Sequence, residues 1–187
     1  MKTVNAVNKN LWLALLGLTI VVFGAVSCNK APQSQVAQFQ GKTMGTTFMV
    51  KAVMPSEQLR NSNLLDDINV VLEDVNAKMS TYRDDSEITL FNRLESLEPF
   101  NVSKETMAVV QEAKRVGELS GGALDITISP LVDLWGFGPK HREGQAPSAA
   151  EIEQAKAKTG LNQLTINQSS LQKGIVGLEI DLSSLDR

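Results

Sequence analysis

An uncharged stretch from Leu11 to Val26 lies near the start of the chain and most constrains what the rest can fold into. Lys2 and Lys9 precede it, and Ser27 and Cys28 follow it. A basic start, an apolar middle and small residues at the end are typical of a secretory signal peptide. The stretch is shorter than the ~20 apolar residues that a transmembrane helix needs, so cleavage is favoured over an uncleaved anchor. The folded domain must therefore be built from the residues that follow.

The only cysteine of the chain, Cys28, lies directly after this stretch. The peptide Ala25-Val26-Ser27-Cys28 resembles the lipobox of bacterial lipoproteins, although Ala stands where Leu is usual. We therefore expect residues 1–27 to be a lipoprotein signal peptide and Cys28 to be the lipidated first residue, anchored by several acyl chains. An ordinary signal peptide with an incidental thiol is the alternative. A nucleophilic role is disfavoured because His141 is the only imidazole that could assist it.

Composition favours a single globular domain after the signal. The 187 residues are 42% hydrophobic, which is enough to support a buried core. With no second cysteine, disulfides and cysteine metal sites are excluded. The formal net charge of −3 argues against broad binding of a phosphate backbone, which needs clustered Lys and Arg. We expect no nucleic acid partner.

The first part of the mature chain divides into a polar stretch, a strand and a helix. Residues 28–40 lack sustained apolar periodicity and are interpreted as a polar tether, so that the domain occupies residues 41–187. Residues 47–53 are rich in β-branched and apolar side chains and predict a strand that ends before Pro55. Apolar residues at spacings of three and four predict a helix over 63–79 with one broad buried face.

Two further helices are indicated by their capping residues. Ser103 can cap a helix that ends at Gly121-Gly122, and Ser148 with Glu151 forms a capping box for a helix that stops near Gly160. Strands are expected over 163–166 and 177–182. Helices set between separated strands predict an α+β fold, with α/β as the alternative.

Three peptides combine turns with polar or aromatic groups. Residues 41–46 contain two glycines but lack the order of a phosphate-binding P-loop. Residues 79–87 place Tyr82, which can stack on a flat ligand, in a polar turn where Ser86 can cap a short helix. Residues 121–139 hold small residues, a carboxylate, Trp135 and Phe137, which could form a pocket wall, although these two aromatics taken alone favour a core position.

The sequence resembles the flavin transferases of the ApbE type, the FAD:protein FMN transferases. The resemblance rests on GKTMGTTF, MSTYRDDSEITLFN, SGGALDITISPLVDLWGFGP and, less completely, EIDLSS, which occur in the family's order. It implies a metal-dependent enzyme, normally using Mg²⁺, that splits FAD and joins FMN through a phosphoester to a Thr or Ser of a target flavoprotein. It also implies the N-terminal portion of the ApbE-like fold, which is related to the T-fold.

The resemblance assigns roles to residues that match the family's motifs. It implies FAD contacts at Met44, Tyr82, Ala123, Leu124, Asp125 and Asp181, with Leu124 replacing a common Phe. Ser184 falls where the family places a metal ligand. Asp133 is a further carboxylate near these motifs but lies outside the matched contacts, and His141 is interpreted as a solvated loop residue.

The resemblance also implies a location and partners. Typical acceptors are flavin-carrying subunits of membrane redox complexes, such as the Na⁺-translocating NADH:quinone reductase and Rnf. With a lipid anchor at Cys28, we expect a protein on the periplasmic side of a bacterial membrane, with the inner membrane favoured.

The end of the sequence departs from the family pattern. Family members continue after the DLSS peptide with a second half that contributes a catalytic histidine and further metal ligands, whereas this sequence reads Leu185-Asp186-Arg187. We therefore expect an incomplete domain that binds FAD weakly and has little or no transferase activity, with its catalytic residues unidentified. The alternative function is a non-enzymatic flavin-binding lipoprotein.

Overall fold

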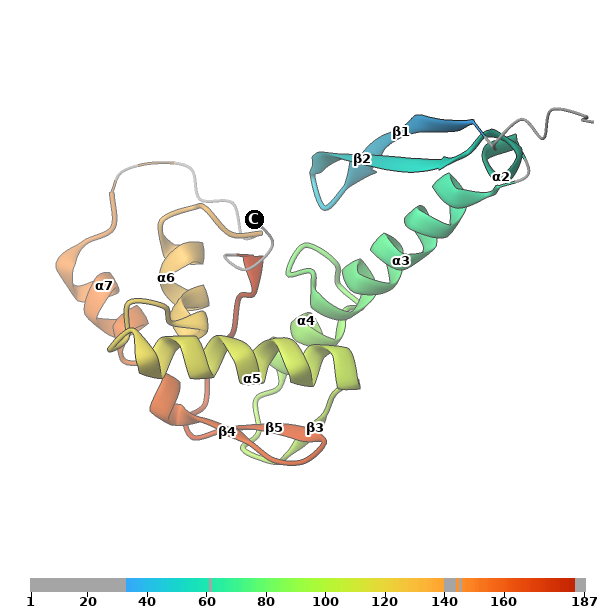
Figure 1. Ribbon diagram of the computed structural model, residues 1–187. Coiled ribbons are helices and arrows are strands. Elements are labelled where there is room, and N and C mark those ends of the chain that lie inside the picture. Colours follow the sequence, from blue (N-terminus) through green and yellow to red (C-terminus); the bar gives the residue numbers. More distant parts are fainter. Residues whose placement is uncertain (1–32, 61, 140–143, 145, 184–187) are drawn as a thin grey trace, which may run out of the picture. The chain divides into compact units, whose positions relative to one another are not determined.

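The computed structural model describes residues 33–60, 62–139, 144 and 146–183 (Figure 1). Helices and small sheets alternate along this part of the chain, and the predicted α+β class is confirmed. These residues divide into two compact units, one made of residues 33–38, 51–60 and 62 and the other of residues 39–50, 63–139, 144 and 146–183. In the described part of the chain, no helix combines the length and the apolar character needed to cross a membrane.

The strands β1 (Ser34–Thr43) and β2 (Thr46–Pro55) form a two-stranded sheet, and the helix α2 (Ser56–Arg60) follows. Met44 and Gly45 join the strands with φ angles of 45° and 72°. Two positive φ angles are what a tight type I′ hairpin turn requires, and they are unusual for a non-glycine residue such as Met44. The strand predicted over 47–53 is confirmed.

The prediction of a polar tether is wrong for its last part, because residues 34–40 belong to β1. A strand needs a neighbour to satisfy its backbone N–H and C=O groups, and β2 supplies it. Side-chain polarity in this stretch therefore did not reveal the backbone pairing. Residues 28–32 lie outside the described residues.

The helix α3 (Leu64–Met79) has the predicted bounds, but its expected buried face is not found. None of its residues is fully buried, and Leu65 and Val71, which belong to the predicted face, are 38% and 63% exposed. Only the end of the helix reaches the core, where Met79 packs against buried side chains. Periodicity shows which side of a helix is apolar, whereas burial depends on what packs against that side.

The helices α4 (Glu87–Arg93) and α5 (Lys104–Leu119) are both capped by serine, as predicted. The Ser86 hydroxyl accepts from the Thr89 N–H at 3.0 Å, and that of Ser103 accepts from the Thr106 N–H at 3.3 Å. The helix α5 ends at Leu119 with Ser120 as its C-cap, and Gly121 follows with a φ of 65°, in agreement with the predicted glycine stop.

The chain then forms a short helical turn η1 (Ile126–Ile128) and the helix α6 (Ser129–Leu134), followed by α7 (Ala149–Lys156). The predicted capping box of α7 is present, since Ser148 and Glu151 each bond the other's backbone N–H. Beyond α7, Gly160 has a φ of 130° and precedes the turn η2 (Leu161–Gln163).

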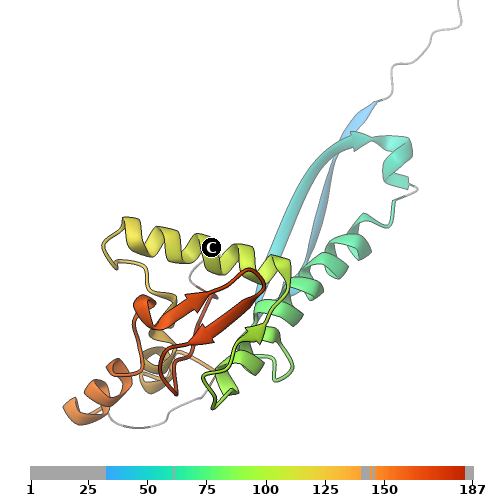
Figure 2. The ribbon, with the colours of Figure 1, turned by 90° about the horizontal axis from the view of Figure 1, so that it is seen from below.

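A three-stranded sheet has the order β3 (Phe100–Asn101), β5 (Ser170–Lys173) and β4 (Leu164–Ile166), with both pairs antiparallel (Figure 2). The predicted strand over 163–166 is confirmed as β4, and β5 was not predicted. The expected strand over 177–182 is not found. Its backbone bonds the Asn92 side chain and the Ile126 carbonyl and does not pair with a neighbouring strand, as described below.

The main core lies between α4, α5 and this sheet. Its buried members come from every part of the larger unit after α3: Ile88, Phe91, Met107, Val110, Ala113, Ile126, Leu164, Leu171, Leu178, Ile180 and Leu182. The last three are fully buried although they lie in no regular element, so the segment before residue 183 is fixed by packing.

Candidate functional site

A pocket of about 320 Å³ opens in the larger unit beside the turn that carries Tyr82. Its volume lies at the lower end of the range for small-molecule sites. The lining side chains are mostly polar and carry both charges: Thr81, Tyr82, Asp84, Thr89, Asn92, Arg93, Ser129, Asp133, Pro139 and Glu179. The pocket therefore suits a ligand with several hydrogen-bonding groups.

The Tyr82 turn is held from inside by hydroxyl groups. The Ser80 carbonyl accepts hydrogen bonds from the hydroxyls of Ser86 at 2.5 Å and Thr89 at 3.2 Å, and the Ser80 hydroxyl accepts from the Tyr82 N–H. Ser80, Ser86 and Thr89 are all buried. These bonds fix the backbone of the turn. Tyr82 is therefore held in place by its backbone although it is 68% exposed.

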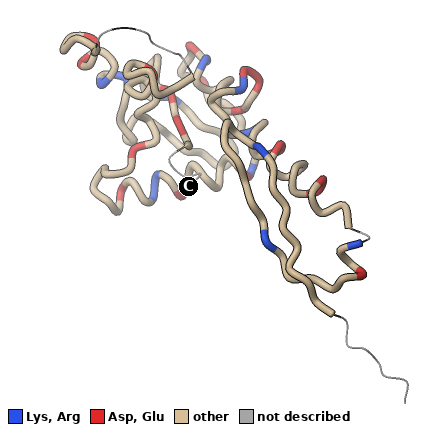
Figure 3. The backbone as a smooth tube through the Cα atoms, turned by 90° about the horizontal axis from the view of Figure 1, so that it is seen from above, with Lys and Arg blue, Asp and Glu red and all other residues tan. Residues whose placement is uncertain are grey.

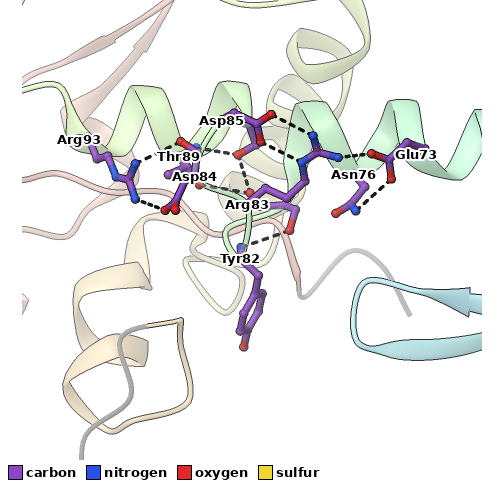
Figure 4. Close-up of polar contacts among 10 residues, drawn as sticks. Glu73, Asn76, Tyr82, Arg83, Asp84, Asp85, Thr89 and Arg93 are labelled. Atoms are coloured by element: carbon purple, nitrogen blue, oxygen red, sulfur yellow. Dashed lines mark hydrogen bonds and ion pairs between the residues drawn. The ribbon is translucent and has the colours of Figure 1, made fainter.

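Ion pairs hold the outside of the same turn (Figure 4). Arg83 pairs with Glu73 of α3 and with Asp85, and Arg93 pairs with Asp84. The hydrogen bonds that Arg83 donates lower the pKa of Asp85, and donating to Asp85 and Glu73 raises the pKa of Arg83. Figure 4 shows the Tyr82 ring pointing away from these pairs, and its hydroxyl donates to the Phe137 carbonyl at 3.2 Å.

The Phe137 carbonyl is available because α6 ends in a glycine turn. Gly136 has a φ of 78°, its N–H bonds the Asp133 carbonyl, and the Phe137 N–H bonds the Val132 carbonyl. The turn leaves Trp135 48% and Phe137 78% exposed, so the interpretation of these aromatics as core residues is wrong. A tight backbone turn, rather than their hydrophobicity, decides where they point.

Asp125, a predicted flavin contact, is the N-cap of η1, and its side chain makes two hydrogen bonds. Its Oδ1 accepts from the N–H of Thr127 at 2.8 Å and from the Thr127 hydroxyl at 2.6 Å. The buried Thr127 hydroxyl also accepts from the Gly160 N–H at 2.6 Å. The position of the Asp125 carboxylate is therefore set by a fixed local network.

Asp181 is brought next to this network by the backbone. Its N–H donates to the Ile126 carbonyl at 2.8 Å, and its Oδ1 accepts from the Ser183 N–H at 2.8 Å. Its side chain is largely buried. The structure thus joins the two peptides that carry Asp125 and Asp181, which are far apart in the sequence, while Tyr82 and Glu179 line the pocket nearby in the same unit.

The other predicted flavin contacts are less closely connected. Met44 lies in the β1–β2 turn, and Ala123 and Leu124 lie between α5 and η1. Of the six predicted flavin contacts, only Tyr82 lines the pocket; Asp125 and Asp181 are outside its lining, as these three are. Leu124 is nevertheless fixed, since its N–H donates to the Ser120 hydroxyl and its carbonyl lies against Gly117 of α5.

Three predicted positions, Cys28, His141 and Ser184, lie outside the described residues, so the lipidation site and the metal ligand stay predictions. Within residues 33–60, 62–139, 144 and 146–183, no three His, Cys, Asp or Glu side chains gather in a way that could hold a metal ion.

Sequence reasoning gave no role to three residues near the site. Asn92 and Arg93 line the pocket from the end of α4, and Lys173 of β5 is buried behind them. Asn92 directly follows the apolar Phe91 in a helix whose Ile88 is also apolar. A polar side chain beside such a face is a signal that could have predicted a polar contact for Asn92. Lys173 gives no such signal, because a lysine in a short polar strand is usually exposed.

The arrangement can bind a polar, partly flat molecule. The exposed Tyr82 ring can stack, carboxylates can accept hydrogen bonds from amide or ribose groups, and Arg93 can donate to an anionic group. A nucleotide has all three kinds of group.

Comparison with known proteins gives one consistent result. The profile of the ApbE family matches residues 44–186. A curated relative from Vibrio cholerae named FAD:protein FMN transferase is 43% identical over 174 residues, which is 93% of this chain and 51% of the relative. The protein of the same name from Escherichia coli K12 is 40% identical, covering 86% of this chain and 48% of the relative.

Solved structures agree with the sequence relatives. A mutant of the flavin transferase ApbE from Vibrio cholerae superposes with a TM-score of 0.77 at 44% identity, over 80% of this chain and 51% of that one. The apo form of the Pseudomonas stutzeri flavinyl transferase ApbE gives a TM-score of 0.73 at 35% identity, over 81% and 50%. The chain therefore spans about half the length of the relatives it matches.

Proposed function

The chain belongs to the ApbE family, and from this premise we propose that it acts in flavin transfer by binding FAD at the Tyr82 pocket. The observation that carries the proposal is the bond between the Asp181 N–H and the Ile126 carbonyl, which brings the Asp125 and Asp181 peptides together. The names of the relatives, FAD:protein FMN transferase, support the same reaction class.

The proposed reaction exchanges one phosphorus–oxygen bond for another. The hydroxyl oxygen of an acceptor Thr or Ser bonds to the phosphorus on the FMN side of the FAD pyrophosphate. The bond from that phosphorus to the bridging oxygen breaks, AMP leaves, and the hydroxyl proton passes to a base. The product is FMN held by a phosphoester.

In this proposal the described residues bind and orient the dinucleotide. Tyr82 offers an exposed ring for a flat group, and its hydroxyl is directed by the Phe137 carbonyl. The Asp125 and Asp181 carboxylates have fixed positions from which to accept hydrogen bonds. We assign the proton-accepting base to no described residue.

Dependence on Mg²⁺ is part of the proposal, since this cation binds phosphate oxygens and can neutralise charge as a pyrophosphate breaks. The described residues do not form a complete site for it, as no cluster of three acidic or imidazole side chains is found among them. We therefore assign no step to the metal. Ser184 stays the proposed protein ligand.

We further propose that the protein is lipid-anchored at Cys28 on the periplasmic side of a bacterial membrane, with the inner membrane favoured. The signal-like residues 1–27 support this location. The proposed acceptors are flavin-carrying subunits of membrane redox complexes of the Na⁺-translocating NADH:quinone reductase or Rnf type. Nucleic acid is not a proposed partner, which is supported by the mixing of basic and acidic residues along the described chain (Figure 3).

The deciding experiment incubates the chain from Cys28 to Arg187 with FAD, Mg²⁺ and an acceptor domain. Mass spectrometry then measures whether the acceptor gains the mass of FMN, and chromatography measures whether AMP is released. Labelling of the acceptor supports transfer by this chain. Binding of FAD that stays intact supports the alternative, a flavin-binding lipoprotein, and no FAD binding at all overturns the proposed function.

A further inference from the structure

The side chain of Asn92, in the last turn of α4, bonds both backbone groups of Ile180. Its Nδ2 donates to the Ile180 carbonyl at 2.9 Å, and its Oδ1 accepts from the Ile180 N–H at 2.8 Å. A neighbouring strand would make the same pair of bonds, so this amide takes the place of a strand partner. Because Ile180 is fully buried, its backbone groups depend on such a partner.

Asn92 is itself held by a buried lysine. The Lys173 ammonium group donates to the carbonyls of Asn92 at 2.9 Å and Leu94 at 2.8 Å, and it lies 5.1 Å from the centre of the Phe91 ring. Lys173 is only 2% exposed. A cation at the C-terminal end of a helix interacts favourably with the carbonyls there, which accounts for its position.

The two bonds between the Asn92 side chain and the Ile180 backbone hold the residue between Glu179 and Asp181. On one side Glu179 lines the pocket, and on the other Asp181 bonds the Ile126 carbonyl, next to Asp125. No regular strand holds this segment. Its position is therefore set by side-chain packing, the Asp181–Ile126 bond and the two bonds from Asn92.

We propose that Asn92, held by Lys173, is a positioning residue that places the Asp181 carboxylate for nucleotide binding by clamping the backbone of Ile180. This inference rests on the proposed function, FAD binding at the Tyr82 pocket. Lys173 acts through Asn92, and Asn92 acts through Asp181. The effect of Lys173 on FAD affinity should therefore require Asn92, and the effect of Asn92 should require Asp181.

The test measures the Kd of FAD by fluorescence for the whole mature chain and four variants: Asn92→Ala, Asp181→Asn, the double variant, and the control Asn76→Ala. Asn76 lies on α3, and its side chain bonds only the exposed Glu73 in the described structure. Circular dichroism checks that each variant is folded at the temperature used. Amide hydrogen exchange is followed at Ile180 and Asp181.

We expect Asn92→Ala to raise the Kd about tenfold, with Asn76→Ala unchanged. In the Asp181→Asn background, Asn92→Ala should change the Kd little further, because the Asp181 carboxylate that Asn92 positions is already absent. Exchange at Ile180 and Asp181 should rise in Asn92→Ala. If that variant does not fold, Lys173→Met replaces it in the same cycle, with the same direction expected.

Each other result overturns the inference. An unchanged Kd in a folded Asn92→Ala protein would show a purely structural role. Effects of Asn92→Ala and Asp181→Asn that simply add would indicate that Asn92 contacts the nucleotide itself. If the unmodified chain binds no FAD, the proposed function fails and the inference fails with it, whereas normal binding with insensitive variants rejects the inference alone.

Discussion

The carboxylate of Glu87 accepts two hydrogen bonds from Ser103, one from its N–H and one from its hydroxyl, both at 2.9 Å. The same oxygen accepts from the buried Thr106 hydroxyl at 2.7 Å. Glu87 is the first residue of α4 and Ser103 is the cap of α5, so a single carboxylate joins the starts of two helices. A negative charge is favourable at both places because helix N-termini carry a partial positive charge.

Glu87→Ala should therefore destabilise the fold by about 1–3 kcal/mol, since it leaves the partly buried Ser103 and Thr106 donors without their acceptor. Denaturant unfolding followed by circular dichroism measures this change. The control is Glu112→Ala, which removes an exposed pair with Arg115 and should cost about 0–1 kcal/mol. Equal effects of the two variants would mean that the Glu87 network does not stabilise the helices.

Gly117→Ala should also destabilise the protein, by about 1–3 kcal/mol. An added Cβ at this position in α5 would lie 2.4 Å from Leu161 Cδ1 and 2.6 Å from the Leu124 carbonyl oxygen. The Leu161 side chain can turn away, but a backbone carbonyl can move only with its peptide. Because Leu124 is a proposed flavin contact, weaker FAD binding should accompany the loss.

Thermal unfolding and FAD titration test this variant, with Glu118→Ala as the exposed control on the same helix. Alanine has a higher helix propensity than glycine by about 1 kcal/mol. A more stable Gly117→Ala protein would therefore contradict the close packing between α5 and the Leu124 peptide.

The sequence predicted helix caps and turns well, because residues close together in the chain form them. The caps Ser86, Ser103 and Ser148 each bond a backbone N–H three residues later, so the sequence contains both partners at a fixed spacing. Gly121, which follows the end of α5, was predicted for the same reason, since a helix stop depends on the glycine and the turn just before it. Tyr82 was placed correctly in a polar turn for this reason.

The sequence did not predict contacts between residues that are far apart in the chain. Asn92 and Ile180 are 88 positions apart, and Lys173 lies 81 positions from Asn92, so no spacing rule connects them. The wrong prediction of a strand over 177–182 has the same cause, because the Ile180 backbone bonds the distant Asn92 side chain and the Asp181 N–H bonds the distant Ile126 carbonyl. The exposed Leu65 and Val71 of α3 show that an apolar helix face does not identify what covers it.

Lys173 should make stability depend on alkaline pH. Burial lowers the pKa of its ammonium group in the folded state, while the unfolded chain keeps the ordinary value of about 10.4. Between these two values the unfolded state binds more protons, so stability rises with pH. The free energy of unfolding of the unmodified protein, minus that of Lys173→Met, should therefore increase as the pH is raised toward about 10.4.

Urea unfolding at a series of pH values measures this difference. Lys51→Met, a substitution at an exposed lysine of β2, is the control and should give a difference that stays flat. A flat difference for Lys173→Met as well would mean that its ammonium group is not destabilised by burial.

Tyr82 should contribute to FAD binding through its ring more than through its hydroxyl. The ring is 68% exposed and free to stack, whereas the hydroxyl already donates to the Phe137 carbonyl at 3.2 Å. Tyr82→Phe keeps the ring, so the Kd for FAD should change by less than about twofold. Tyr82→Leu removes the aromatic face, and the loss of about 0.5–1.5 kcal/mol of ring stacking should raise the Kd by roughly 2- to 12-fold.

Flavin fluorescence gives a second reading of the same contact. The phenol of a stacked Tyr quenches an excited flavin by electron transfer, so bound FAD should be quenched more strongly in the unmodified protein than in Tyr82→Phe or Tyr82→Leu. Phe137→Leu is the matched control, since it removes a 78% exposed ring but keeps the carbonyl that Tyr82 bonds. If Phe137→Leu weakens FAD binding and Tyr82→Leu does not, the flavin nucleotide stacks on the turn after α6 and not on the Tyr82 turn.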